Sequence, residues 1–225
     1  MKKISGKNKK NRRLKKWVKV TIMLLGISLL LLIVIVGYKI CNKYIFKDKS
    51  DDAVETVKKE ELDLNNYNYY INSSASEYEK KLFNELKDIL SKEEVNEEEY
   101  AKVLTKVFVA DLFTLSSKNS SSDVPSSQYV YDSYRETFEI MVRDTIYSSV
   151  ELNLNGNRNQ VLPTVNNIDI NSVERKSFSL NGKQLSEQAF YVKLSIKYKE
   201  DLGYPTNYEV VLVKNNELLQ VVKAG

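Results

Sequence analysis

The longest apolar run of the chain lies close to its N-terminus. Between Lys19 and Lys39, the 19 residues from Val20 to Tyr38 carry no charge. A helix rises 1.5 Å per residue, so this run would extend about 28 Å, close to the ~30 Å hydrocarbon core of a bilayer. The run is apolar on every side, whereas a helix of a soluble domain shows one apolar stripe. The sequence therefore predicts one transmembrane helix over residues 20–38.

The basic residues indicate how this helix is oriented. Residues 1–19 hold ten of the 34 Lys and Arg residues and none of the acidic residues. Because the more basic flank of a span stays inside the cell, residues 1–19 are predicted to be a basic cytoplasmic tail and the C-terminal part to be extracytoplasmic. Trp17, Lys19 and Lys39 are the predicted membrane-interface residues. The expected partner of the tail is the lipid bilayer, and no nucleic-acid partner is expected.

A cleaved signal peptide is the alternative to an anchor, because both begin with basic residues followed by an apolar run. This run is longer than the apolar region of a usual signal peptide, and the small residues of a cleavage site do not follow it. The only cysteine, Cys41, comes after Lys39 and Ile40, where a lipoprotein signal requires small residues. The sequence thus favours an uncleaved anchor and predicts a single-pass protein of the cell membrane.

Residues 39–73 are predicted to be a stalk or linker between the membrane and a folded domain. The part from 47 to 64 is dense in charge, as expected of a solvated segment. Tyr67, Tyr69 and Ile71 make the following part unusually apolar for a spacer. We expect this part to lie against the domain or a partner.

A helical period follows the predicted stalk. Ser74 and Glu77 stand at the spacing of a capping box, and Ser76 is an alternative cap. A second helix is predicted from Asn96, because the three glutamates after it suit the positive end of a helix dipole. After a polar break, a third helix is predicted over residues 128–148. The predicted buried positions of the three helices are Tyr78, Leu82, Phe83, Leu86, Ile89 and Leu90; Tyr100, Val103, Leu104, Val107, Phe108 and Leu112; and Tyr131, Tyr134, Phe138, Met141, Val142 and Thr145.

The C-terminal third changes from a period of 3.6 residues to a period of 2. Residues 165–180 are predicted to form one long or bent strand, and the pair Asn181-Gly182 closes it as a hairpin turn. The clearest strand covers residues 189–198, where apolar and polar side chains alternate. Residues 208–213 and 218–222 are predicted to pair as a second hairpin. Because consecutive strands are joined by short turns, an antiparallel sheet is expected.

Helices first and antiparallel strands last predict an α+β fold, with helices packed on one face of a curved antiparallel sheet of about four strands. Residues 74–225 are assigned to this extracytoplasmic α+β domain. At this length, folding removes roughly two-thirds of the chain's surface from water, which is enough for one core.

The composition excludes several kinds of chemistry. Without histidine, the chain has no Ser-His-Asp or Cys-His nucleophile and no histidine-based metal site. Gly-rich phosphate loops and the common catalytic motifs are also missing from the sequence. We therefore predict no enzymatic activity, cofactor or metal. Asp111 and Asp144 lie in apolar helical stretches and would face a cleft with Arg135 or Arg143; the alternative is a pair of ordinary ion pairs on the helix surface.

Tyrosine is used far more than the other aromatic residues, with 15 Tyr against seven Phe and one Trp. Tyrosine is favoured in contact surfaces because it gives a large area at low entropy cost. Tyr129, Tyr131 and Tyr134 cluster at the start of the third predicted helix, and Tyr191 projects from the outer side of its strand. These four residues are the predicted interaction surface, and half-buried tyrosines at the rim of the core are the alternative.

Three parts of the chain carry a resemblance to a known family. They are the helical block from Tyr78 to Ile146, the strand from Phe190 to Tyr198, and the ending YEVVLVKNNELLQVV from Tyr208 to Val222. Together with the basic tail and the single anchor, they resemble the VirB8-like and TcpC-like proteins of bacterial conjugation and type IV secretion. The resemblance implies an NTF2-like outer domain.

The same resemblance implies a function and partners. It implies a bitopic, membrane-anchored assembly or scaffold subunit of a cell-envelope complex for conjugative transfer or type IV secretion-like transport. Self-association and contacts with other envelope proteins are then expected. The alternative is a membrane-anchored ligand-binding or sensing module that uses the pocket of the NTF2-like fold.

Overall fold

The computed structural model describes residues 59–62 and 67–225. Their helices and strands are β1 (Lys59–Leu62), β2 (Tyr69–Asn72), α2 (Glu77–Leu90), α3 (Glu97–Phe113), the 3-10 turns η1 (Leu115–Ser117), η2 (Pro125–Tyr129) and η3 (Asp132–Tyr134), α4 (Arg135–Asp144), β3 (Val165–Leu180), β4 (Lys183–Tyr198), β5 (Asn207–Asn215) and β6 (Leu218–Ala224). β1 pairs with β2, and the other four strands form one sheet.

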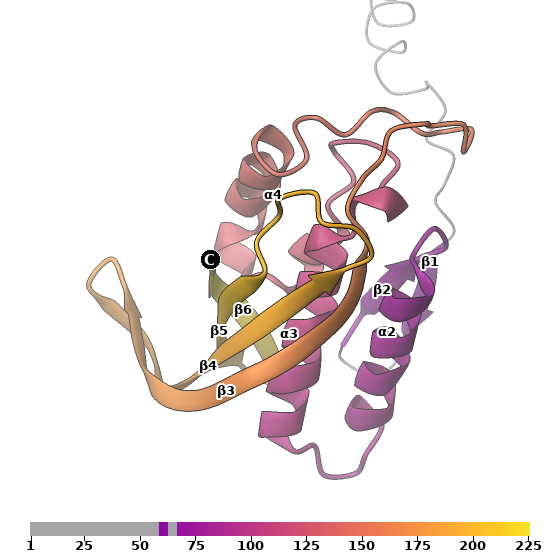
Figure 1. Ribbon diagram of the computed structural model, residues 1–225. Coiled ribbons are helices and arrows are strands. Elements are labelled where there is room, and N and C mark those ends of the chain that lie inside the picture. The colour runs from indigo at the N-terminus through magenta and orange to yellow at the C-terminus, as the bar shows by residue number, and fades with distance from the viewer. Residues whose placement is uncertain (1–58, 63–66) are drawn as a thin grey trace, which may run out of the picture. The chain divides into compact units, whose positions relative to one another are not determined.

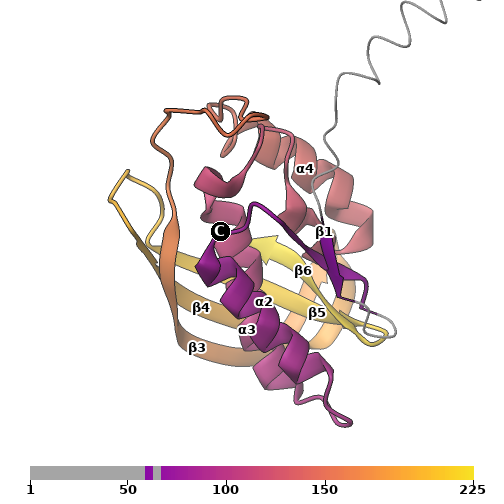
Figure 2. The same ribbon diagram turned by 90° about the vertical axis from the view of Figure 1, so that its right-hand side faces the viewer.

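Helices α2 and α3 pack on one face of a four-stranded sheet (Figures 1 and 2). The strand order is β3-β4-β5-β6, and every neighbouring pair is antiparallel. Strand order thus equals sequence order, because each strand returns directly beside the one before it. The α+β architecture and the number of strands in the main sheet are confirmed.

Short turns fix the register of the sheet. Asn181 and Gly182 both have positive φ, 49° and 77°, and join Leu180 to its partner Lys183. Such backbone angles suit the two-residue turns that match the twist of a hairpin, and Asn and Gly adopt them most readily. Asn216, with φ of 55°, stands in the turn between β5 and β6. Both predicted hairpins are therefore confirmed, and β3 has the predicted bounds.

The two faces of the sheet are both covered near the β3–β4 hairpin. On β4, Phe190 and Val192 face the helices and are at most 2% exposed, as the alternation predicts. On β5, Val211 and Val213 point to the opposite face yet are also buried. Phe178 from the hairpin joins them in a second apolar cluster. The long hairpin bends strongly (Figure 1), and its own side chains help to cover the outer face of the sheet.

Side-chain caps start the first two helices. Ser76 is the N-cap of α2, and Ser76 and Glu79 satisfy each other's backbone N–H groups in a capping box. The alternative cap was thus the correct one, and the predicted pair Ser74 and Glu77 was wrong. Asn96 caps α3 as predicted, accepting hydrogen bonds from two backbone N–H groups. The predicted apolar face of α2 is confirmed.

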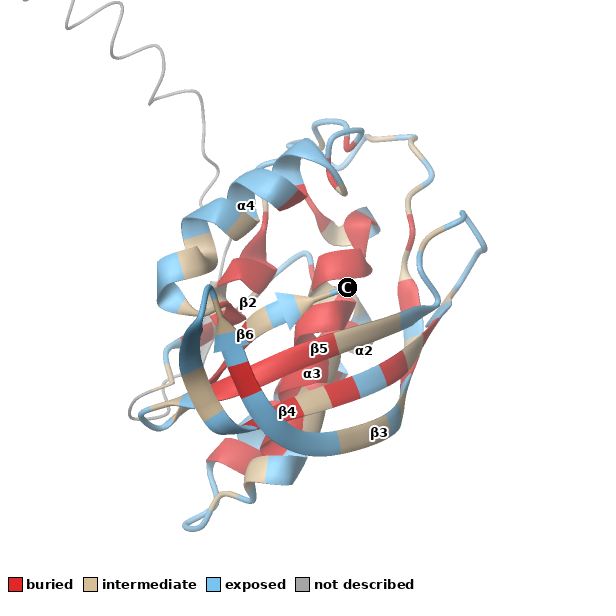
Figure 3. Ribbon diagram, turned by 90° about the vertical axis from the view of Figure 1, so that its left-hand side faces the viewer, coloured by how far each residue is buried: buried red, intermediate tan, exposed pale blue. Residues whose placement is uncertain are grey.

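Helix α3 is the centre of the core rather than a helix with one buried face. Besides the predicted face, Ala101, Thr105 and Val109 are 0% exposed. In Figure 3 the buried colour covers most of this helix. The reason is tertiary: α3 contacts the sheet on one side, and α2 and the η2 turn on others. A helix covered on several sides needs apolar residues around most of its circumference.

The predicted third helix over 128–148 is wrong in its first part. Val130 forms a parallel bridge with Val221 of β6, and the backbone N–H of Tyr131 donates to the carbonyl of Val221 at 2.9 Å. This pairing holds the chain extended, so α4 begins only at Arg135. Val142 is the buried residue of α4, whereas Met141 is 50% exposed. Sheet pairing thus overrides the helical period at this point.

Residues just before α2 are part of the folded domain. Tyr69 is 4% exposed, and its hydroxyl lies 2.8 Å from that of Tyr100 on α3. The Tyr100 hydroxyl also accepts a hydrogen bond from the backbone N–H of Leu219 on β6. The Gln128 side chain pairs with both backbone groups of Tyr70. The domain therefore begins before Ser74, the predicted boundary, because tyrosines of the predicted stalk insert into the core.

Candidate functional site

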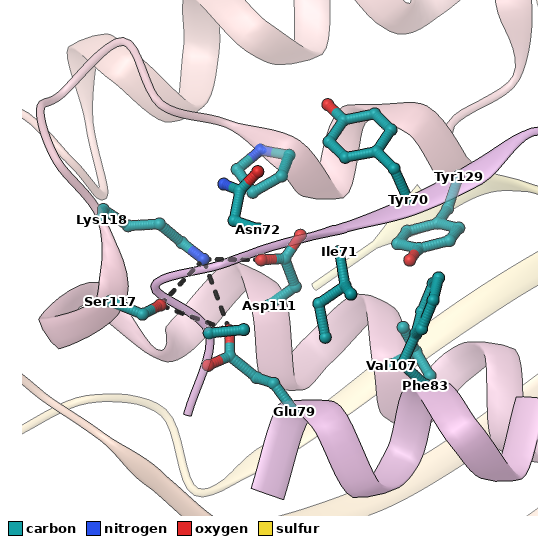
Figure 4. A pocket seen from close by; sticks show the side chains of 12 residues that line it. Tyr70, Ile71, Asn72, Glu79, Phe83, Val107, Asp111, Ser117, Lys118 and Tyr129 are labelled. Carbon is teal, nitrogen blue, oxygen red and sulfur yellow. Dashed lines mark hydrogen bonds and ion pairs between the residues drawn. The ribbon is translucent and has the colours of Figure 1, made fainter. Parts of the chain in front are cut away.

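The most strongly charged buried site is built around Lys118. This side chain is 2% exposed and lies in the loop after α3. Its Nζ is 2.6 Å from Asp111 Oδ1 on α3 and 3.5 Å from Glu79 Oε1 on α2 (Figure 4). A buried ammonium group is unfavourable unless carboxylates pair with it. The lysine therefore holds the N-terminal turn of α2, the C-terminal part of α3 and the loop together.

Glu79 has two structural roles at this site. Its Oε2 accepts the backbone N–H of Ser76 at 2.7 Å as part of the capping box. Its Oε1 faces Lys118 and accepts a hydrogen bond from Ser117 Oγ at 3.3 Å. Both carboxylate oxygens are thus occupied, which fixes the rotamer of Glu79 and the position of the start of α2.

Asp111 is the acid whose ionisation is most perturbed. Its pKa is raised to about 6: burial is the main cause, Lys118 acts in the opposite direction, and the charge on Glu79 adds to the rise. Burial also opposes the charge on Lys118, but the two carboxylates outweigh this effect and raise the pKa of its ammonium group. One cation shared by two acids explains why the pKa values of both Asp111 and Lys118 are raised. Lys118 is held charged by two carboxylates, but it neutralises only one of their two negative charges.

The cavity beside Asp111 is small. Its volume is about 20 Å³, which matches a single water molecule. Asp111 Oδ2 is buried and has no hydrogen-bond partner among the described residues. A cavity of this size does not accommodate a substrate, so the site is suited to holding the loop in place and to taking up a proton.

A second set of contacts, made by Arg158 and Tyr147, also holds the loop after α3. The Arg158 guanidinium donates to the carbonyls of Lys118 at 2.9 Å, Ser116 at 3.0 Å and Glu151 at 3.0 Å. The buried hydroxyl of Tyr147 donates to the carbonyl of Leu112 at the end of α3. The Tyr147 bond satisfies a carbonyl group that the end of α3 leaves unpaired, and the Arg158 bonds satisfy carbonyl groups outside this helix. The ion cluster therefore lies in a rigid part of the domain.

The other predicted acid does not belong to this site. Asp144 is 57% exposed at the end of α4 and pairs with its neighbour Arg143 at 2.8 Å. Arg135 pairs instead with Asp132, also on the surface. For Asp144, Arg135 and Arg143 the surface ion pair is thus the correct interpretation, and the predicted cleft of acids and arginines does not form.

An apolar pocket lies between α4 and the C-terminal strand. Its volume is about 200 Å³. Phe138 and Met141 line it from α4, and Val221 and Ala224 line it from β6. Tyr208 of β5 adds an aromatic wall and stacks edge to face on Phe113, with ring centroids 5.1 Å apart. This pocket is open to solvent, has a larger volume than the cavity beside Asp111, and is the candidate ligand site.

The predicted tyrosine surface is divided among three places. Tyr129 is 2% exposed and packs against Tyr69, so the prediction of a surface role is wrong for this residue. Tyr131 and Tyr191 are half-buried beside the second apolar cluster, and Tyr191 donates to the carbonyl of Ser177. Tyr134 lines the apolar pocket. Half-buried rim residues are therefore the correct description of Tyr131, Tyr134 and Tyr191.

Sequence reasoning missed Lys118 and Glu79. Lys118 stands in the serine-rich polar break between the second and third predicted helices. The residues beside it give no indication that its side chain is buried. Glu79 did carry a signal, because it stands three residues after the alternative cap Ser76. The residues that line the apolar pocket come from α3, η3, α4, β5 and β6 and from loops between them, so no local pattern connects them.

Comparisons with protein-family models, curated proteins and solved structures found no match to the chain. Among the described residues no helix is long and apolar enough to cross a membrane. The predicted span from Val20 to Tyr38 and the interface residues Trp17, Lys19 and Lys39 lie outside the described residues. Their roles stay predictions.

Lys118→Met is expected to destabilise the domain strongly, by roughly 3–5 kcal/mol, because it leaves two buried carboxylates without their cation. Chemical denaturation of the full-length protein, followed by near-ultraviolet circular dichroism, measures this loss. Lys102→Met is the matched control, since Lys102 pairs with Glu98 on the exposed side of α3 and should change stability by no more than about 0.5 kcal/mol. Equal effects of the two variants would contradict the role of Lys118.

Asp111→Asn is expected to change the dependence of stability on pH. The folded state holds the Asp111 proton up to a pKa of about 6, whereas the unfolded chain releases it near 3.9. Between these values the folded state binds more protons, so this group makes the free energy of unfolding fall as pH rises from about 4 to 6. Relative to Asp111→Asn, the wild type should lose about 1–3 kcal/mol over this range. Parallel pH profiles of the two proteins would refute the raised pKa.

Proposed function

We propose that the protein is a membrane-anchored assembly or scaffold subunit of a cell-envelope complex, of the kind that serves conjugative transfer or type IV secretion-like transport. One observation carries the proposal. An uncharged run of 19 residues, preceded by a basic tail, precedes a domain with helices on one face of a four-stranded antiparallel sheet. This order of parts resembles VirB8-like and TcpC-like proteins, and the domain is consistent with their NTF2-like fold.

The outer side of α4 supports a role in protein contacts. Ile140 is 45% exposed and Met141 is 50% exposed, side by side on this short helix. Figure 3 shows that most of α4 is exposed, in contrast to α3. Neighbouring exposed apolar side chains favour a contact surface when they project from a rigid element. We propose that this side of α4 contacts a second copy of the chain or another envelope protein.

A ligand-binding or sensing module is the second candidate function. The apolar pocket between α4 and β6 favours it, because a domain without any cavity would have no place for a ligand. The two candidate sites share Met141, which lines the pocket, whereas Ile140 lies outside the lining.

The proposed topology is tested by labelling cysteines in intact cells. In a Cys41→Ser background, Asn155→Cys places a thiol in an exposed turn of the domain, and Ser5→Cys places one in the tail. A membrane-impermeant maleimide should label position 155 in intact cells and position 5 only after permeabilisation. The reverse pattern would show that the domain is cytoplasmic and would overturn the proposal.

The proposed contact surface is tested by photo-crosslinking in cells. A benzophenone amino acid in place of Ile140 should give a discrete crosslinked product containing a second copy or another membrane protein. Gln188, exposed on the β3–β4 hairpin, is the matched control position and should give no such product. Met141→Glu should reduce the product at position 140 by about tenfold, because burying an unpaired charge at an interface is unfavourable. The absence of a product at position 140, or equal products at both positions, would contradict the surface.

A further inference from the structure

The pocket between α4 and β6 has a defined shape because two rigid elements form its walls. The backbone pairing of Val130 and Tyr131 with Val221 holds the chain that leads into α4 against the sheet. Val142 is 0% exposed and anchors the C-terminal part of α4 on the core. Between these two fixed points the helix stands away from β6, which leaves about 200 Å³ between Phe138, Met141 and the strand.

The volume of the pocket sets the size of the molecule that fits. A cavity of about 150 Å³ lined by apolar residues binds benzene. The volume of the pocket here, about 200 Å³, exceeds that of the benzene-binding cavity by the volume of a few atoms. Because the pocket is open to solvent, its volume limits the part of a ligand that it holds. A single six-membered ring with a short substituent is the class of molecule that fills it.

The lining favours an aromatic ring. Phe138, Tyr134 and Tyr208 present aromatic side chains to the pocket, and Leu112 and Val221 contribute aliphatic ones. Aromatic rings pack favourably against one another in offset or edge-to-face geometry. The ring of Phe138 is itself held by Phe108, with centroids 5.8 Å apart, so this wall is ordered before a ligand enters.

The polar groups of the lining favour a neutral ligand. They are the hydroxyl groups of Tyr134, Thr137 and Tyr208 and the ammonium group of Lys223. Burial raises the pKa of the Tyr208 hydroxyl, which keeps it protonated and able to donate. Lys223 already pairs with Glu209 at 3.6 Å, so its charge is compensated. A carboxylate in the pocket would lose water without gaining a free cation, whereas a neutral hydroxyl finds hydroxyl partners.

We infer that this pocket binds a small neutral aromatic molecule, of the size of one ring with a single hydroxyl-bearing substituent. The inference rests on the second candidate function, the ligand-binding module, and names its class of ligand. It is tested separately from the scaffold role, because Ile140, the crosslinking position, lies outside the lining of the pocket.

The experiment uses the full-length protein in lipid nanodiscs and two fluorinated probes. 4-Fluorobenzyl alcohol is the neutral probe and 4-fluorobenzoate is its charged counterpart. Binding is followed by fluorine NMR, with empty nanodiscs as the reference for partition into lipid. The alcohol should bind with a Kd of about 1 mM, as expected for so few atoms, and the benzoate at least about tenfold more weakly.

Variants that fill the pocket test where the probe binds. Thr137→Phe adds a larger side chain to the pocket from α4, and Ala224→Leu adds one from β6. If one of these variants misfolds, the other still tests the site. Each should weaken binding of the alcohol by about tenfold. Ser133→Phe is the matched control, since Ser133 is exposed nearby and does not line the pocket, and it should stay within about twofold of wild type.

Three results would overturn the inference: no binding of the alcohol above the empty nanodisc, equal or tighter binding of the benzoate, or unchanged binding in both filled variants. Crosslinking at Ile140 is read separately. If crosslinks persist while the probe fails to bind, the ligand inference fails and the scaffold role stands. If the probe binds while crosslinks are absent, the ligand inference stands and the scaffold role fails.

Discussion

The domain depends on a single buried cation. Lys118 is removed from water, and its two carboxylate partners come from different helices, so the charge is compensated only when α2, α3 and the loop after α3 are in place together. An incorrectly packed arrangement would leave a charge buried and unpaired, which is among the most unfavourable events in a protein interior. The ion cluster therefore specifies one arrangement of the helical layer, and the sheet packs against a helix, α3, whose position is already fixed.

The same arrangement decides where the molecule is accessible. Because α3 is covered by α2, the η2 turn and the sheet, most of its surface is buried, and its exposed part is the charged side that carries Glu98 and Lys102. The outer face of the sheet is covered near the β3–β4 hairpin by side chains of the hairpin itself. Helix α4 is different, since only Val142 is fully buried and the helix packs mainly on the η2 and η3 turns. The pocket and the exposed pair Ile140 and Met141 both follow from this partial attachment.

The segment that connects the predicted anchor to the domain is also part of the core. Tyr69 links β2 to α3 through Tyr100, and Tyr100 reaches the backbone of β6. Burial raises the pKa of both hydroxyl groups, so they remain neutral at physiological pH and keep these hydrogen bonds.

The sequence by itself determined the parts of this protein that rest on local interactions. The strands followed from alternation, the hairpins from Asn181-Gly182 and its counterpart near Asn216, and the helix starts from capping side chains, because each depends on residues a few positions apart. Only the tertiary structure decided the burial of Lys118 and Tyr129, the shortening of the third helix and the existence of the pocket. Each of these arises from contacts between residues far apart in the chain: Lys118 with Glu79, and Val130 with Val221. Periodicity shows which face of a helix or strand is apolar. It does not show which distant segment of the chain will cover that face.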